Sequence, residues 1–105
     1  MAEYAIDFES FKWEEVTPGK RQKLFTVGKN RIRILELSNG YKEANWCDKR
    51  HIGYVIEGQV TIVFEDKDIT LDKGEGLYIS GGEKSRHKAQ VADGQTVQLL
   101  LFEEA

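Results

Sequence analysis

The chain has 105 residues, with 15 Lys and Arg against 18 Asp and Glu, so its formal net charge is −3. This length fits one domain, and a hydrophobic fraction of 40% suffices for one core. The mild acidity argues against general nucleic-acid binding. One cysteine excludes an internal disulfide and a multi-cysteine zinc module, and no apolar run suits a signal peptide or a membrane span. We therefore expect a soluble, cytoplasmic domain with neither a nucleic-acid nor a membrane partner.

Short alternating apolar runs predict β-strands along the whole chain. In chain order these runs cover residues 32–37, 54–64, 77–79 and 96–102. Turn signals rich in glycine, asparagine and aspartate stand between them, and their spacing is typical of a sandwich or barrel of short strands. The sequence therefore predicts an all-β fold.

Four segments carry more specific predictions. Residues 1–12 contain three bulky apolar side chains and are expected to form an N-terminal arm, which either pairs with another chain or forms a short helical turn. Gly58 is predicted to take a positive φ in a hairpin turn. Residues 99–102 are apolar on both faces, which favours burial between two sheets or in a subunit interface, and hence a homodimer. Residues 103–105 are expected to form a solvated tail.

Two segments resemble the motifs of the cupin family. Residues 40–58 read GYKEANWCDKRHIGYVIEG, and their second half is similar to the usual cupin phrase E-x-x-Y-V-L-E-G. Residues 72–89 read DKGEGLYISGGEKSRHKA, which fits a glycine, a short apolar strand and Pro-x-Gly, with Ser80 in place of the proline. The resemblance spans about residues 13–102. It implies a single-domain cupin barrel, a double-stranded β-helix or jelly roll, over residues 13–105.

The usual cupin metal ligands are replaced in this sequence. Carried over by motif, the first two histidine positions fall on Asn45 and Cys47, the glutamate position falls on His51, and the last histidine position falls on Ser85, two residues before His87. The resemblance therefore does not imply a site of three histidines and one glutamate. Cys47, His51 and His87 are still ligand types. A thiolate with two imidazoles suits a single divalent transition metal such as zinc, nickel or iron.

Cys47 and His51 can reach one ion only if the chain turns between them. Residues four apart on a straight strand lie ~13 Å apart, because each residue adds about 3.3 Å. Residues 48–50 must then form a corner. A separation above about 6 Å among the three side chains would exclude the metal site, since metal–ligand bonds are about 2.0–2.3 Å long.

The resemblance implies a cupin that binds a small molecule in its lumen, with an altered or degenerate metal site. The residues predicted to line the ligand site are Asn45, Cys47, His51, Tyr54, Ser85 and His87. One alternative is a metal-dependent enzyme, dioxygenase-like or isomerase-like, that uses Cys47, His51 and His87. Another is a metal-free enzyme with His51 or His87 as general acid or base. A non-enzymatic assembly module is the remaining alternative.

Overall fold

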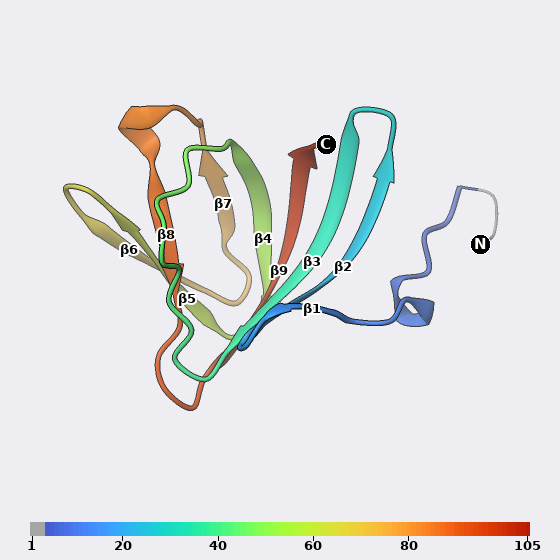
Figure 1. The fold of residues 1–105 in the computed structure, drawn as a ribbon, viewed down its shortest axis with the longest axis horizontal. Helices are drawn as coiled ribbons and strands as arrows, with labels where there is room; N and C mark the ends of the chain where they lie inside the picture. Colours follow the sequence, from blue (N-terminus) through green and yellow to red (C-terminus); the bar gives the residue numbers. More distant parts are fainter. Residues whose placement is uncertain (1–3) are drawn as a thin grey trace.

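The computed structural model describes residues 4–105, which form two facing antiparallel sheets. The large sheet has the strand order β1-β2-β3-β9-β4-β7 and the small sheet has the order β6-β5-β8. The strands are β1 (Glu14–Thr17), β2 (Lys20–Val27), β3 (Asn30–Ser38), β4 (His51–Glu57), β5 (Gln59–Phe64), β6 (Asp68–Asp72), β7 (Gly76–Ile79), β8 (His87–Gln90) and β9 (Thr96–Glu104). The two sheets converge at one end and diverge at the other (Figure 1).

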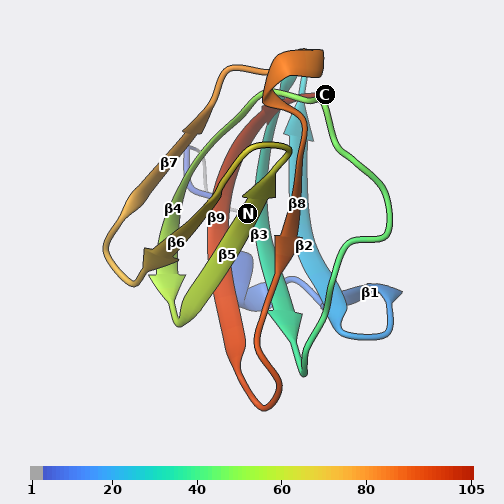
Figure 2. The same ribbon diagram turned by 90° about the vertical axis from the view of Figure 1, so that its left-hand side faces the viewer.

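The chain passes repeatedly from one sheet to the other after β4, which is the topology of a jelly roll. Viewed from the side, the small sheet lies in front of β4, β9 and β3 (Figure 2). Gly58 marks the first passage, with a φ of +83°, as the sequence predicts. The prediction of a hairpin at this glycine is wrong, because β4 and β5 belong to different sheets. A side chain at Gly58 would clash with the carbonyl oxygen of Thr96.

The predicted all-β fold is confirmed, and each apolar run found in the sequence lies in a strand. The run over 32–37 lies in β3, the run over 77–79 in β7 and the run over 96–102 in β9. The run over 54–64 is divided between β4 and β5. The strands β1, β2, β6 and β8 were not predicted, because polar and charged residues predominate in them and few apolar side chains mark an alternation.

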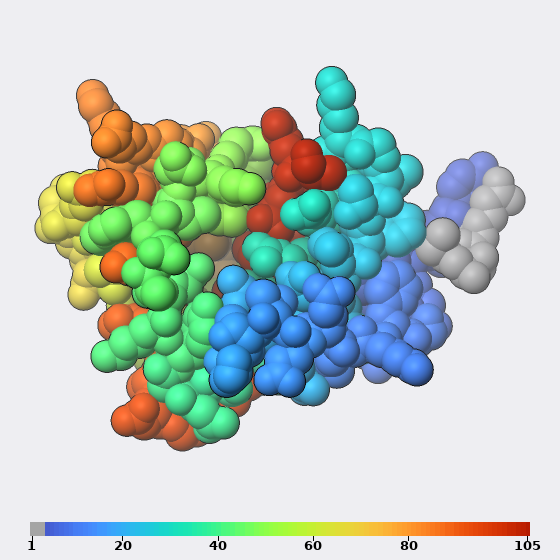
Figure 3. Space-filling view, in the orientation of Figure 1, coloured from blue at the N-terminus to red at the C-terminus, as the bar shows by residue number. Residues whose placement is uncertain are grey.

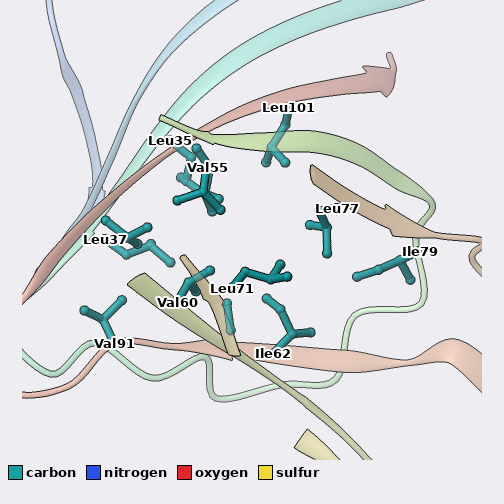
Figure 4. Packing of buried hydrophobic residues seen from close by; sticks show 13 residues of the cluster. Leu35, Leu37, Val55, Val60, Ile62, Leu71, Leu77, Ile79, Val91 and Leu101 are labelled. Atoms are coloured by element: carbon teal, nitrogen blue, oxygen red, sulfur yellow. The ribbon is translucent and has the colours of Figure 1, made fainter. Parts of the chain in front are cut away.

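The core fills the space between the sheets (Figure 4). Its buried side chains come from both sheets and stand at alternate positions along the strands, as expected when one face of each strand points inward. The thirteen residues are Leu35, Leu37, Val55, Val60, Ile62, Leu71, Leu77, Ile79, Ala89, Val91, Val97, Leu99 and Leu101. The inward residues of β3 and β9 are apolar at one end of the strand pair and charged at the other, where Arg31 and Arg33 of β3 lie beside Glu103 of β9. A polar region therefore borders the core at one end of these strands.

The prediction of a solvated tail over residues 103–105 needs correction at Glu103, which belongs to β9 and whose side chain is only 9% exposed. Its burial is compensated by Arg33, which donates two hydrogen bonds to it. Glu104 also belongs to β9, but it is exposed, as is Ala105. Residues 99–102 are not buried on both faces within the chain, because Leu99 and Leu101 enter the core whereas Phe102 remains 47% exposed. The alternative, burial of the second face in a subunit interface, stays a prediction.

The N-terminal arm is described from residue 4, and the predicted segment 1–12 lies partly outside the described residues. Phe8–Ser10 form a short 3-10 turn, and the Phe8 and Phe11 rings lie 5.1 Å apart. The Lys23 ammonium of β2 donates a hydrogen bond to the Phe8 carbonyl at 2.9 Å, which ties this turn to the large sheet. Within residues 4–105, no helix is long and apolar enough to cross a membrane.

Candidate metal and ligand site

Cys47, His51 and His87 come together through a β-bridge, a turn of the chain and the start of β4. The backbone of Cys47 pairs with that of His87 in an isolated β-bridge, with N···O distances of 2.8 and 2.9 Å. Residues 48–50 then turn the chain, and His51 begins β4. As a result, Cys47 Sγ lies 3.6 Å from His51 Nε2, and one donor atom of each of the three residues lies within 4.8 Å of the others. The corner that the sequence requires is present, and the separation that would exclude a shared ion is not reached.

The hydrogen-bond partner of His87 Nδ1 determines which nitrogen of the ring carries the proton. Its Nδ1 lies 3.0 Å from the carbonyl oxygen of Ser85, which can only accept a hydrogen bond, so Nδ1 carries the proton and Nε2 keeps its lone pair. Burial lowers the pKa of His87, and the nearby ring of His51 lowers it further, whereas the hydrogen bond to Ser85 acts in the opposite direction. His87 therefore favours the neutral form, which is the form that binds metal.

The Glu103 carboxylate lies beside His51 Nδ1, and Arg33 in turn binds this carboxylate. His51 Nδ1 is buried and lies 3.2 Å from Glu103 Oε2, within ion-pair distance but not aligned as a hydrogen bond, while Nε2 lies 3.6 Å from Cys47 Sγ. Burial acts to raise the pKa of Glu103, but the contact with His51 and the charge of Arg33 outweigh it, so this pKa is lowered. Glu103 is therefore an anion. A carboxylate at the second nitrogen is the usual means by which a protein orients a metal-binding imidazole.

The donor set fits a tetrahedral transition-metal ion. With bonds of about 2.3 Å to sulfur and 2.0–2.1 Å to nitrogen, tetrahedral geometry separates the two donors by ~3.5 Å. The distance of 3.6 Å between Cys47 Sγ and His51 Nε2 agrees with this value. A movement of about 1.3 Å would bring donors 4.8 Å apart to the separation that tetrahedral geometry requires. Three protein donors would leave a fourth position open.

A cavity of about 230 Å³ adjoins these donors. Besides Cys47, His51 and His87, its lining combines apolar core residues with charged side chains, which are Lys20, Arg31, Arg33, Glu43, Lys49 and Glu103. In the space-filling view, the segment around residues 40–50, drawn in green, crosses in front of the gap between the two sheets, and the surface is hollowed beside it (Figure 3). Ordered polar groups around a small cavity are typical of a binding site for a small molecule.

The structure does not bring all the predicted ligand-site residues into this cavity. Asn45 and Tyr54 are exposed and are not part of the lining. The Ser85 hydroxyl lies 3.1 Å from that of Ser80, and only its carbonyl contributes to the site, through His87. Tyr54 lies outside because successive side chains of β4 alternate, and His51 takes the inward face.

No family model and no curated protein sequence matches the chain. Solved structures match it closely in shape. The polyketide cyclase RemF from Streptomyces resistomycificus superposes with a TM-score of 0.80 and 20% identity, over 95% of this chain and 78% of its own. An RmlC-like cupin from Shewanella frigidimarina matches with a TM-score of 0.78 and 13% identity, over 98% and 91% of the two chains.

The chain has the cupin fold. KdgF from Halomonas sp. is a further match, with a TM-score of 0.76 and 18% identity over 100% of this chain and 96% of its own. The resemblance that rests on residues 40–58 and 72–89 is thus confirmed for the fold.

Within this cupin barrel, sequence reasoning missed the charged residues of β3 and β9. Arg31, Arg33 and Glu103 share the inward face with Leu35 and Leu37, but the apolar pattern of β3 drew attention to Ile32 and Ile34, which point the other way. The alternation Arg31, Arg33, Leu35, Leu37 was the available signal. The pairing of Arg33 with Glu103, seventy residues apart, has no signal in a single sequence.

Proposed function

We propose that this cupin-fold protein binds a small molecule at a divalent transition-metal ion held by Cys47, His51 and His87. The observation that carries the proposal is the convergence of one sulfur and two imidazole donors within 4.8 Å beside a cavity. Soft thiolate and imidazole donors favour zinc, nickel or iron over magnesium or calcium. A thiol ligand needs a reducing compartment, which agrees with the cytoplasmic location we propose.

The same geometry favours a second candidate, a metal-dependent enzyme of the dioxygenase or isomerase type. The specific observation is that three donors, not four, converge beside the cavity. An ion held by three donors would keep a position for water or substrate, as catalytic metal sites do. The metal would supply Lewis-acid chemistry there. Among the similar structures, RemF is described as a polyketide cyclase, and a cupin from Silicibacter pomeroyi, with a TM-score of 0.76 and 13% identity over 93% of this chain and 73% of its own, is described as a sugar phosphate isomerase.

The metal proposal is tested by the zinc content and zinc affinity of the purified protein. We expect one ion per chain, because the three donors already surround one position. The substitutions Cys47→Ser and His87→Gln should each weaken zinc binding by at least tenfold, about 1.4 kcal/mol or more, since each removes one of three bonds. Competition with a chromophoric chelator measures these affinities.

Ser85→Ala provides a matched control. It removes a hydroxyl close to the site and retains the carbonyl that accepts from His87 Nδ1, so zinc affinity should not change. Zinc that binds equally well to the wild type and to both ligand variants would show that the ion is held elsewhere. A wild-type chain that takes up no zinc would also contradict the proposal.

We also propose that the protein is a homodimer that covers the outer face of the large sheet. The register places Ile32, Phe102, Ile52 and Tyr78 side by side across β3, β9, β4 and β7, and Tyr54 pairs with Leu100 in the next row. Four of the eight large hydrophobic residues that are exposed among residues 4–105 lie in this outer patch, namely Ile52, Tyr54, Tyr78 and Phe102. A second copy is the occupant we propose, because a face that is apolar across four strands can pack on its own symmetry mate.

A further inference from the structure

The cavity carries more positive charge than the chain neutralises. Four cationic side chains and two carboxylates line it. Both carboxylates are already engaged. Glu103 accepts two hydrogen bonds from Arg33, at 2.8 and 3.0 Å. Glu43 accepts a hydrogen bond from the Ala89 backbone at 2.7 Å and lies 4.0 Å from Lys20. Arg31 and Lys49 remain without an acidic partner among residues 4–105.

Arg31 is the cation of this lining with a buried hydrogen-bond donor that no acceptor of residues 4–105 satisfies. Its Nε is buried, and within residues 4–105 it has no hydrogen-bond partner. Its neighbour across the sheet on β9 is Glu103, whose carboxylate is taken by Arg33 and contacted by His51. A buried donor on a permanent cation is costly to leave unpaired. Arg31 is half-buried and lines the cavity, so a ligand in the cavity can supply the acceptor that the chain does not.

We propose that Arg31 binds the carboxylate of a small organic acid in this cavity. A guanidinium presents paired N–H donors that match the two oxygens of a carboxylate. A guanidinium also forms paired hydrogen bonds to phosphate, so inorganic phosphate is the competing ligand that the test has to exclude. The volume of about 230 Å³ suits a compound smaller than a drug-sized ligand, for which cavities of about 300–1,000 Å³ are usual.

The inference deepens the proposed function and rests on it in one respect, since it names the ligand class of the same cavity. Arg31, Cys47, His51 and His87 all line that cavity. An acid held by Arg31 at one end can direct a second oxygen toward the open position of the metal. The arginine site itself does not require the metal, so the two proposals can be tested separately.

The test is titration calorimetry with malonate, its neutral counterpart malonamide, and inorganic phosphate. The protein is used both free of metal and loaded with zinc. We expect malonate to bind the metal-free chain and malonamide not to bind it. Arg31→Gln should weaken malonate binding at least tenfold, and Arg31→Lys, which keeps the charge, should weaken it less. The control is Arg21→Gln, which removes a cation that already pairs with Glu36 on the outer face and should leave binding unchanged.

The outcomes separate this inference from the metal proposal. If Arg31→Gln keeps the zinc affinity of the wild type and loses malonate, the inference is supported. If the wild type binds no zinc but binds malonate through Arg31, the inference stands and the metal proposal fails. Equal affinity for malonate and malonamide, tighter binding of phosphate than of malonate, or unchanged malonate binding in both folded Arg31 variants would overturn the inference.

Discussion

Glu36 and Glu103 show how single carboxylates are stabilised as anions on opposite faces of the large sheet. Glu103 faces the cavity and is supported by Arg33 and His51. Glu36 faces outward, where the Arg21 guanidinium donates a hydrogen bond to it at 2.7 Å and the Gln98 amide donates another at 2.8 Å. The hydrogen bond from Arg21 lowers the pKa of Glu36, burial opposes this shift, and Gln98 adds to the lowering.

The lowered pKa of Glu36 predicts a specific dependence of stability on pH. Its contribution is present above the unfolded value of 4.5 and is lost as the pH falls through the lower folded value. Glu36→Gln should therefore reduce the free energy of unfolding by about 1 kcal/mol at neutral pH, and this difference should shrink toward about pH 4 and below. Urea unfolding at several pH values measures it.

Glu57→Gln is the control for this prediction. Glu57 lies 3.1 Å from Lys73, but both side chains are about two-thirds exposed, at 64% and 66%. Solvent screens such a pair, so its loss should change stability by less than about 0.5 kcal/mol. Equal losses in the two variants, or a Glu36→Gln loss that persists in acid, would contradict the role assigned to the Arg21 contact.

At the scale of elements, β3, β4 and β9 divide the interior into a core and a site. Each of these strands has an apolar inward face over part of its length, and the polar inward residues Arg31, His51 and Glu103 come together through the antiparallel register. The register therefore decides which polar groups meet. A shift of one residue would turn them to the outer face.

At Gly53, β4 packs closely on β9. A Cβ there would lie 2.6 Å from the Leu100 carbonyl oxygen and 2.7 Å from Leu101 Cδ2. Gly53→Ala should thus lower the free energy of unfolding by about 2 kcal/mol, because the strands must separate slightly. Gly76→Ala on the neighbouring strand β7 would place its Cβ 3.6 Å from the nearest atom and should be nearly neutral. Urea unfolding of both variants tests this, and equal effects would contradict it.

At the scale of the whole molecule, the inner faces of the two sheets and the outer face of the large sheet have different surroundings. The inner faces meet in the core and open into the cavity. On the outer face of the large sheet, the N-terminal arm lies against β2, where Trp13 packs on Arg21 and Lys23, whereas Phe102, Ile52 and Tyr78 on β9, β4 and β7 remain exposed, Tyr78 at 69%. The homodimer proposed above accounts for these exposed residues.

The dimer prediction is checked by size-exclusion chromatography with light scattering. The wild type should have twice the mass of the 12.0 kDa chain. Phe102→Glu should yield monomers, because it places a charge in the centre of the outer patch. Val16→Glu changes a residue of nearly equal exposure, 46% against 47%, on the edge strand β1 and should leave the dimer intact. A monomeric wild type, or a dimer that survives Phe102→Glu, would sink this prediction.

The sequence by itself determined the all-β class and the main strands, and it singled out Cys47, His51 and His87, whose side chains converge in the structure. It could do so because alternation is a local property, and because Cys47, His51 and His87 are rare residues that fall at or beside positions of recognisable motifs. It also predicted that residues 48–50 must turn if Cys47 and His51 share an ion, which the 3.6 Å approach of their donors confirms.

Only the tertiary structure decided which other residues join these donors. Arg33 and Glu103 are seventy residues apart, and their pairing depends on the register of β3 with β9. The same register leaves Arg31 buried without an acceptor among residues 4–105 and excludes Tyr54 from the cavity. Side chains far apart in sequence become partners only when strands pair, because cross-strand neighbours are set by the sheet and not by local sequence.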